Sequence, residues 1–349
     1  FKLPEAKGGA TFVGPDTVFV STDFGPGSMT ESGYPRISKL WKRSQPLSEA
    51  TTIFKGKAED VGVFATMIHT PERDYPMVIV APTFFTNDYY LCEGGELRHL
   101  DLPADANIEA IFKNQLLVSL KSDWKRDGTS WKQGALVSID IDELLTGEGQ
   151  LSMVYEPDAS SSISSVSRTR DLVLINRMED VRNRLEAYSL VDGEWSAHAI
   201  DAPVMGSIDI SSTSEDSNFF YFTYTDFLNP TTLCEAEGLS APTVRKALPT
   251  FFDASPYEVQ QQFATSTDGT RVPYFIVARK DLVRNGKNPT LIYAYGGFEV
   301  SMRPNYSATV GMDWLDQGGV YVLANIRGGG EYGPNWHRQA QRENRQKSY

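Results

Sequence analysis

The segment Leu291-Ile292-Tyr293-Ala294-Tyr295-Gly296-Gly297-Phe298 is an apolar run that ends directly in two glycines. A second apolar run, Gly319–Ala324, follows, and Ala308–Asp316 between the two has the composition of a helix. A further helix is predicted over Asn335–Lys347. The order strand, helix, strand, helix is typical of an α/β domain with a largely parallel sheet. We therefore expect residues 256–349 to begin such a domain.

The chain before residue 256 has a different pattern, made of short apolar or alternating runs that turn residues separate. We count about nineteen such runs at a spacing of 8–12 residues, which indicates a sandwich, a barrel or a propeller. Four strands per blade and about 45–50 residues per blade both give about five blades. Two stacked β-sandwiches are the alternative. The predicted fold is thus mostly β, with an incomplete β-propeller over residues 1–255.

Composition excludes several classes of protein. The chain has 349 residues, with 33 Lys and Arg against 45 Asp and Glu, and a net charge of -12. A chain this acidic is a poor binder of nucleic acid and of anionic membranes. Its two cysteines, Cys92 and Cys234, are too few for a disulfide framework or a cysteine-rich zinc site. We expect no metal, no cofactor, no nucleic-acid partner and no membrane partner.

Two glycine-rich segments are candidates for chemistry. Glycines after the strand at 291–295 let the backbone approach a substrate carbonyl, and the Tyr295 hydroxyl could donate to a developing negative charge. The alternative is a tight turn with a half-buried tyrosine. The second segment, Ala324–Gly333, contains three consecutive glycines but no Gly-Lys-Ser/Thr. It is interpreted as a structural loop beneath an active site, not as a phosphate-binding loop.

The four histidines and a serine-rich run are predicted to have structural roles. His69, His99 and His198 have no carboxylate or cysteine partners at metal-ligand spacing, which favours surface or packing roles. His337 begins a cation-rich predicted helix and is also interpreted as structural. Ser160–Ser165 lacks the glycines of a nucleophile turn and is predicted to be a loop between blades.

Four segments carry a resemblance to a known family: Asp268-Gly269-Thr270-Arg271-Val272-Pro273, Tyr295-Gly296-Gly297-Phe298, Pro304-Asn305-Tyr306, and Ala324–Gly333 with Trp336-His337. Taken together, these segments closely resemble the prolyl oligopeptidase family of serine peptidases. The resemblance implies a seven-bladed propeller that caps an α/β-hydrolase domain, and cleavage of short peptides, typically after proline. It also implies that Tyr295 supplies the oxyanion-hole hydroxyl and that Phe298 lines the substrate pocket.

The chain also departs from the family pattern. The family's nucleophilic serine lies in a Gly-x-Ser-x-Gly turn after the next strand, and its acid and histidine lie further downstream. No such pentapeptide occurs between Phe1 and Tyr349. We therefore expect an internal fragment with about five of seven blades, truncated before the nucleophile and inactive alone. The Gly-Gly-Phe form favours the prolyl branch, while basic-residue and acylaminoacyl specificities stay open.

Two functions are compatible with these observations. The first is a fragment of a serine-type oligopeptidase that hydrolyses short peptides after proline and needs the rest of the hydrolase domain to complete its fold. The second is a non-catalytic β-propeller module that binds a peptide or a protein. Either would be a soluble protein, with cytoplasm and periplasm both open as its compartment.

Overall fold

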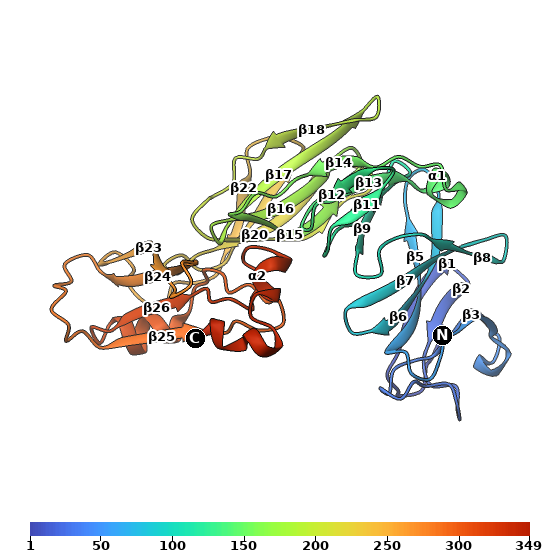
Figure 1. Cartoon of the computed structure of the whole chain (residues 1–349), viewed down its shortest axis with the longest axis horizontal. Coiled ribbons are helices and arrows are strands. Elements are labelled where there is room, and N and C mark those ends of the chain that lie inside the picture. The colour runs from blue at the N-terminus through green and yellow to red at the C-terminus, as the bar shows by residue number, and fades with distance from the viewer. The chain divides into compact units, whose positions relative to one another are not determined.

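The computed structural model describes residues 1–349, which divide into two compact units, Phe1–Met153 and Val154–Tyr349 (Figure 1). Five four-stranded sheets occupy the chain up to Ala247, and each is built from strands that are consecutive apart from one inserted hairpin. This is the strand organisation predicted for propeller blades, with twenty-two strands, β1 to β22, where about nineteen were expected.

Three of these sheets belong wholly or mainly to the first unit. The third carries the inserted hairpin and is completed by β14, which spans the division between the units. The strands of the first sheet are β1 (Gly9–Gly14), β2 (Thr17–Ser21), β3 (Ile37–Lys42) and β4 (Thr51–Lys55), with a 3₁₀ turn η1 (Leu47–Glu49). Those of the second are β5 (Gly62–His69), β6 (Asp74–Thr83), β7 (Thr86–Glu93) and β8 (Glu96–Leu100). Those of the third are β9 (Asn107–Phe112), β10 (Gln115–Ser119), β13 (Leu136–Asp140) and β14 (Ser152–Tyr155), with the hairpin β11 (Trp124–Arg126) and β12 (Thr129–Trp131).

A single short helix, α1 (Ile141–Thr146), interrupts the strands of the first unit. The Asp140 side chain caps it by accepting hydrogen bonds from the amides of Asp142 and Glu143. Gly147, with φ of 82°, ends it in the left-handed conformation that glycine favours.

Two further sheets begin the second unit. The fourth sheet holds β15 (Ser161–Arg168), β16 (Val173–Glu179), β17 (Arg182–Val191) and β18 (Glu194–Ala199). The fifth holds β19 (Ser207–Thr213), β20 (Phe219–Thr225), β21 (Thr232–Glu237) and β22 (Thr243–Ala247). The prediction of a loop at Ser160–Ser165 is wrong, because this run starts strand β15. Its buried hydroxyls have partners: Ser161 accepts from the Tyr155 hydroxyl, and Ser162 donates to the Glu331 carbonyl.

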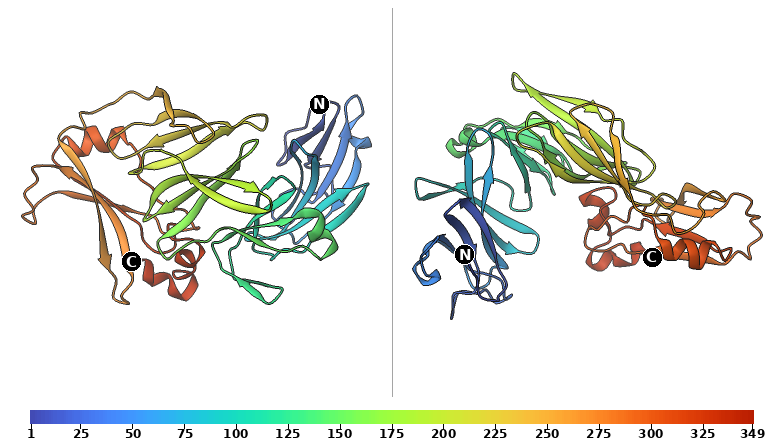
Figure 2. Two further views of the ribbon diagram at one scale, coloured as in Figure 1. Left: turned by 90° about the horizontal axis from the view of Figure 1, so that it is seen from above. Right: turned by 180° about the vertical axis from the view of Figure 1, so that it is seen from behind.

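The last sheet of the chain, drawn mainly in orange in Figure 2, has the order β23-β24-β26-β25, and its strands are labelled in Figure 1. Its strands are β23 (Tyr257–Thr265), β24 (Arg271–Arg279), β25 (Thr290–Ala294) and β26 (Val320–Ala324). Only β25 and β26 pair in parallel, so the expected parallel sheet is mixed in this part of the chain. The reason is local: the short turn at Gly269, with φ of 83°, forces β23 and β24 to be antiparallel.

The helices in this part of the chain agree only partly with those predicted from the sequence. The helix predicted over Ala308–Asp316 is present, with a π-helical stretch η2 (Val310–Leu315). The helix predicted over Asn335–Lys347 is two shorter pieces, α2 (Pro334–Arg338) and the 3₁₀ helix η3 (Arg342–Ser348). Arg342 has φ of 51°, which an α-helix cannot contain, so the backbone turns there.

Hydrophobic packing joins the blades of the second unit to the last sheet. One buried cluster combines Val181 and Phe227, from the blade region, with Tyr257, Phe275 and Leu323 of the last sheet. Residues on both sides of position 255 therefore share a core, and the division into 1–255 and 256–349 stays a prediction. Both cysteines are free, and no helix is long and apolar enough to cross a membrane.

Candidate functional site

The chain makes an unusual turn directly after β25. Gly296 has φ of 61°, Phe298 of 52° and Glu299 of 59°. Two consecutive non-glycine residues in the left-handed region are strained by about 1–3 kcal/mol each and persist only where the surroundings hold them. We call Tyr295–Val300 the 295–300 turn.

Backbone packing against the second glycine-rich segment explains why Gly296 is a glycine. A Cβ on Gly296 would lie 2.6 Å from Cγ1 of Ile326, and one on Gly328 would lie 2.2 Å from the Gly296 carbonyl oxygen. Gly297 differs, because its Cβ would only meet the Tyr295 ring, at 3.4 Å. The segment predicted to be a structural loop thus packs directly on the 295–300 turn.

The two residues predicted for the site both lie in this turn. Tyr295 is 44% exposed, and its ring folds back over Gly297, with the hydroxyl 3.6 Å from the position of a Cβ there. Phe298 is 70% exposed. A half-exposed phenol and an exposed aromatic ring three residues apart are accessible to a ligand. Their roles in catalysis and substrate binding stay predictions.

Arg327 anchors the glycine-rich loop from below. Its side chain is 3% exposed, and Nη1 donates to Oδ2 of Asp268 at 2.5 Å and to the Thr270 hydroxyl. Nη2 donates to the hydroxyl of Ser266, and Nε donates to the Lys347 carbonyl. The guanidinium holds the pKa of Asp268 well below its usual range. One cation therefore joins the β23–β24 hairpin, the loop and η3.

Glu331 is buried on the other side of the loop. Oε1 accepts hydrogen bonds from the Met302 amide at 2.9 Å and from Nδ2 of Asn325 at 3.2 Å. Oε2 is buried without a hydrogen-bond partner. Burial raises the pKa of the Glu331 carboxyl.

Two basic residues reach the 295–300 turn from the last helical segments. Nη1 of Arg345 donates to the Gly296 carbonyl. Nδ1 of His337 lies 2.6 Å from the Gly328 carbonyl oxygen and 3.1 Å from the Glu299 amide nitrogen. The structural interpretation of His337 agrees with these contacts, whereas Arg345 was not singled out from the sequence. Its only signal there was its place in a cation-rich run.

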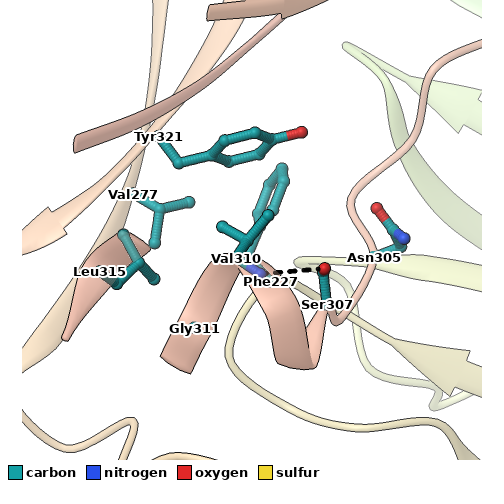
Figure 3. A pocket seen from close by; sticks show the side chains of 8 residues that line it. All are labelled: Phe227, Val277, Asn305, Ser307, Val310, Gly311, Leu315 and Tyr321. Atoms are coloured by element: carbon teal, nitrogen blue, oxygen red, sulfur yellow. Dashed lines mark hydrogen bonds between the residues drawn. The ribbon is translucent and has the colours of Figure 1, made fainter. Parts of the chain in front are cut away.

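A small pocket lies elsewhere in the second unit (Figure 3). The rings of Phe227 and Tyr321 meet there edge to face, 6.1 Å apart, and Asn305 and Ser307 supply polar groups. Ser307 caps the adjacent helix by accepting from the Val310 amide, 3.3 Å away. Neither predicted site residue lines this pocket. No group of three or more His, Cys, Asp or Glu residues is arranged to hold a metal ion.

Family models match most of the chain. One described as the prolyl oligopeptidase N-terminal beta-propeller domain matches residues 4–241, and one described as the prolyl oligopeptidase family matches residues 306–349.

Individual relatives extend the similarity over the full chain. A protein of Sinorhizobium fredii named as an uncharacterized peptidase is 34% identical over all of this chain and 49% of its own length. A prolyl endopeptidase of Elizabethkingia meningoseptica is 30% identical over 60% of this chain and 26% of its own length. A solved post-proline cleaving enzyme of Rickettsia typhi has a TM-score of 0.90 and 29% identity, covering 98% of this chain and 51% of that one. The chain spans about half the length of the relatives that match it throughout.

Proposed function

Because the chain belongs to the prolyl oligopeptidase family, we propose that it is part of a serine peptidase that hydrolyses short peptides after proline. The observation that carries the proposal is the 295–300 turn, which presents Tyr295 and Phe298 at the end of a parallel strand. The names of two relatives, a prolyl endopeptidase and a post-proline cleaving enzyme, support the specificity.

Tyr295 acts in this proposal as an oxyanion-hole donor. A serine from the remainder of the protein attacks the scissile carbonyl after a histidine takes its proton, and negative charge develops on the carbonyl oxygen. A phenolic O–H fixed by the turn stabilises that charge more than it stabilises the neutral substrate carbonyl. The exposed ring of Phe298 offers an apolar surface for the substrate, which suits a proline ring.

The remaining hydrolase domain is the proposed partner of β25. All five residues of this strand are exposed, including Leu291, Ile292 and Tyr293. Parallel strands are normally covered on both faces and paired on both edges, because an open apolar edge promotes aggregation. We infer that further hydrolase elements cover this strand in the parent protein.

The test uses the full-length parent protein and a proline-containing chromogenic peptide amide. The expected result is cleavage on the carboxyl side of proline, with loss of activity after reaction with an active-site serine phosphonate. A matched peptide with alanine in place of proline serves as the specificity control. Binding of the peptides without cleavage or phosphonate labelling would overturn the proposal and support a non-catalytic binding module. Cleavage of both peptides at equal rates would overturn only the preference for proline.

A further inference from the structure

We propose that Arg345 and His337 form a two-point clamp that positions Tyr295 and Phe298, an inference that rests on the proposed peptidase function. Neither side chain is placed in contact with substrate. Arg345 acts on a backbone carbonyl of the 295–300 turn, and His337 acts on the Gly328 carbonyl that accepts from the Glu299 amide, so both are positioning residues. Arg345 sets the position of the Tyr295 hydroxyl, and His337 sets that of the Phe298 ring.

The first point of the clamp is the Gly296 carbonyl. It follows Tyr295 directly, and the Arg345 guanidinium donates to it from 49 residues away. The α-carbon of Gly328 packs against the same carbonyl, so the oxygen is held by a donor and by a steric contact. Rotation of the peptide between Gly296 and Gly297 would break the Arg345 hydrogen bond and the contact with Gly328. It would also move the backbone under the Tyr295 ring.

The second point is the Gly328 carbonyl. The 2.6 Å separation leads us to assign Nδ1 of His337 as the protonated nitrogen that donates to it. With this tautomer Nδ1 cannot accept from the Glu299 amide, whose nitrogen lies 3.1 Å away, and that amide donates instead to the Gly328 carbonyl oxygen at 3.2 Å. The imidazole therefore fixes the acceptor that holds Glu299, the second of the two left-handed residues.

Both clamp residues are themselves anchored. Trp336, next to His337, is buried, and its carbonyl accepts from the Gly328 amide. The η3 segment that carries Arg345 is joined to the loop by two bonds, from the Ser348 hydroxyl to the Arg327 carbonyl and from Arg327 Nε to the Lys347 carbonyl. A donor on an anchored segment can select one conformation of a strained turn, whereas a mobile one cannot.

Release of either point should let the turn relax, with different consequences. Loss of the Arg345 bond frees the peptide beside Tyr295 and disturbs a hydrogen bond made in the transition state, so kcat falls. Loss of the His337 bond lets Phe298 and Glu299 leave the left-handed region and moves the ring that receives the substrate, so KM rises.

Hydrogen exchange in the full-length parent protein tests the clamp without reference to activity. The amides of residues 296–300 should exchange faster in Arg345→Ala and in His337→Leu than in wild type. Lys347→Ala, which removes a neighbouring exposed cation, is the matched control and should leave their exchange unchanged. Unchanged exchange in both clamp variants overturns the proposal, whatever the enzyme does.

Steady-state kinetics with a proline-containing amide tests the division of roles. Arg345→Ala should lower kcat by about tenfold with KM within about twofold, since a small misplacement of a catalytic group costs much of its effect. Arg345→Lys, which keeps a cationic donor, should recover part of the loss. His337→Leu should raise KM by about fivefold or more, and His337→Asn, which can still donate to Gly328, should restore it.

A double variant separates positioning from general damage. In the Tyr295→Phe background, Arg345→Ala should lower kcat little further, because both changes remove the same interaction. Fully multiplicative losses would overturn the assignment of Arg345 to Tyr295. If the wild-type parent cleaves no proline-containing peptide, the proposed function fails, and hydrogen exchange alone decides the clamp.

Discussion

The hydroxyl of Tyr332 donates a 2.9 Å hydrogen bond to Oδ1 of Asp180, which lies 152 residues earlier in the chain. The Asp180 carbonyl accepts a second bond from Nε2 of Gln261, at 2.6 Å. Burial, together with the Asp180 carboxylate, raises the pKa of the Tyr332 phenol. The next residue, Val181, is fully buried in the core shared with the last sheet. The tip of the β16–β17 hairpin is thus a fixed attachment between a blade and the last sheet.

At Val181, replacement by glycine should be no more destabilising than replacement by alanine, which reverses the usual order. Val181 has φ of 68°, which is a steric outlier for a β-branched residue. Val181→Ala should lower the free energy of unfolding by about 2 kcal/mol through lost apolar burial, and it keeps the backbone strain. Val181→Gly should lose slightly more buried apolar area, but it removes the cost of holding a side chain in the left-handed conformation, which is about 1 kcal/mol or more. We therefore expect the glycine variant to be at least as stable as the alanine variant, measured by denaturant unfolding of the full-length protein.

The control for this comparison is Ala187, which is fully buried in β17. There Ala187→Gly should destabilise in the usual way, by about 1 kcal/mol. If Val181→Gly is clearly less stable than Val181→Ala, the hairpin tip carries no strain of the kind described.

The two glycines after Tyr295 should differ sharply in tolerance. Gly296→Ala adds a Cβ that collides with Ile326 and also places alanine at a positive φ, so we expect a loss of at least about 2 kcal/mol. Gly297→Ala meets only ordinary contacts and should change stability by less than about 1 kcal/mol. Thermal unfolding of the two single variants checks the difference. Equal losses would contradict the close packing of Gly296 on the loop.

Tyr295→Phe tests the hydroxyl itself. The ring and its packing over Gly297 are kept, so the protein should fold with nearly unchanged stability. Loss of one oxyanion-hole donor should lower kcat for a proline-containing amide by roughly 10²-fold, with a much smaller change in KM. Activated ester substrates should lose less. A kcat within about twofold of wild type would assign Tyr295 to packing alone.

The buried carboxyl of Glu331 should make stability depend on pH. Its pKa is raised by burial in the folded protein, so the unfolded chain releases this proton at lower pH than the folded protein does. The stability that this carboxyl contributes is therefore present at low pH, and it is lost as the pH rises above the pKa of Glu in the unfolded chain, about 4.3. Glu331→Gln removes this loss while Oε1 still accepts from Met302 and Asn325.

The measurement is the midpoint of thermal unfolding of Glu331→Gln relative to wild type, at pH 4.5 and at pH 8. The variant should gain relative stability at the higher pH. Glu343→Gln, which removes an exposed carboxylate of η3, controls for the change in net charge. A difference that does not vary with pH would mean that Glu331 is not ionised differently in the folded protein.

Residues 1–349 expressed alone should not cleave a proline-containing amide or react with a serine phosphonate. They contain no Gly-x-Ser-x-Gly turn, and oxyanion donors without a nucleophile have no intermediate to stabilise. Stoichiometric phosphonate labelling of this chain, read by mass spectrometry, would reveal a nucleophile outside such a turn.

Local signals in the sequence predicted strands, turns and the Tyr295 segment well. The turn between β23 and β24 depends on Asp268 and Gly269 themselves, and α1 depends on the adjacent residues Asp140 and Gly147 that cap it. The Ser160–Ser165 strand was missed because part of what stabilises it is distant: Ser162 finds its acceptor 169 residues away, on Glu331. Patterns of apolar residues carry no information about such partners.

The same limit applies to the end of the chain and to the site. A continuous helix over Asn335–Lys347 would satisfy local propensity, but tertiary bonds from Arg327 to Lys347 and from Ser348 to Arg327 accompany a turn at Arg342. Arg345 looked like one cation among several, and only the folded chain shows that it reaches Gly296. Tyr295 is singled out by the sequence because glycines and an aromatic residue follow it directly, and its role in the site stays a prediction.

The bond between Arg345 and Gly296 also has a consequence for the order of events during synthesis. A growing chain exposes its amino-terminal part first, and the 295–300 turn leaves the ribosome before Gly328 and 49 residues before Arg345. Until those residues arrive, the contacts that Gly328 and Arg345 make with the turn cannot form. The 295–300 turn, for which we propose a substrate-facing role, therefore lacks these contacts in the nascent protein. The geometry proposed for peptide cleavage forms only after the segment through Ser348 has been made.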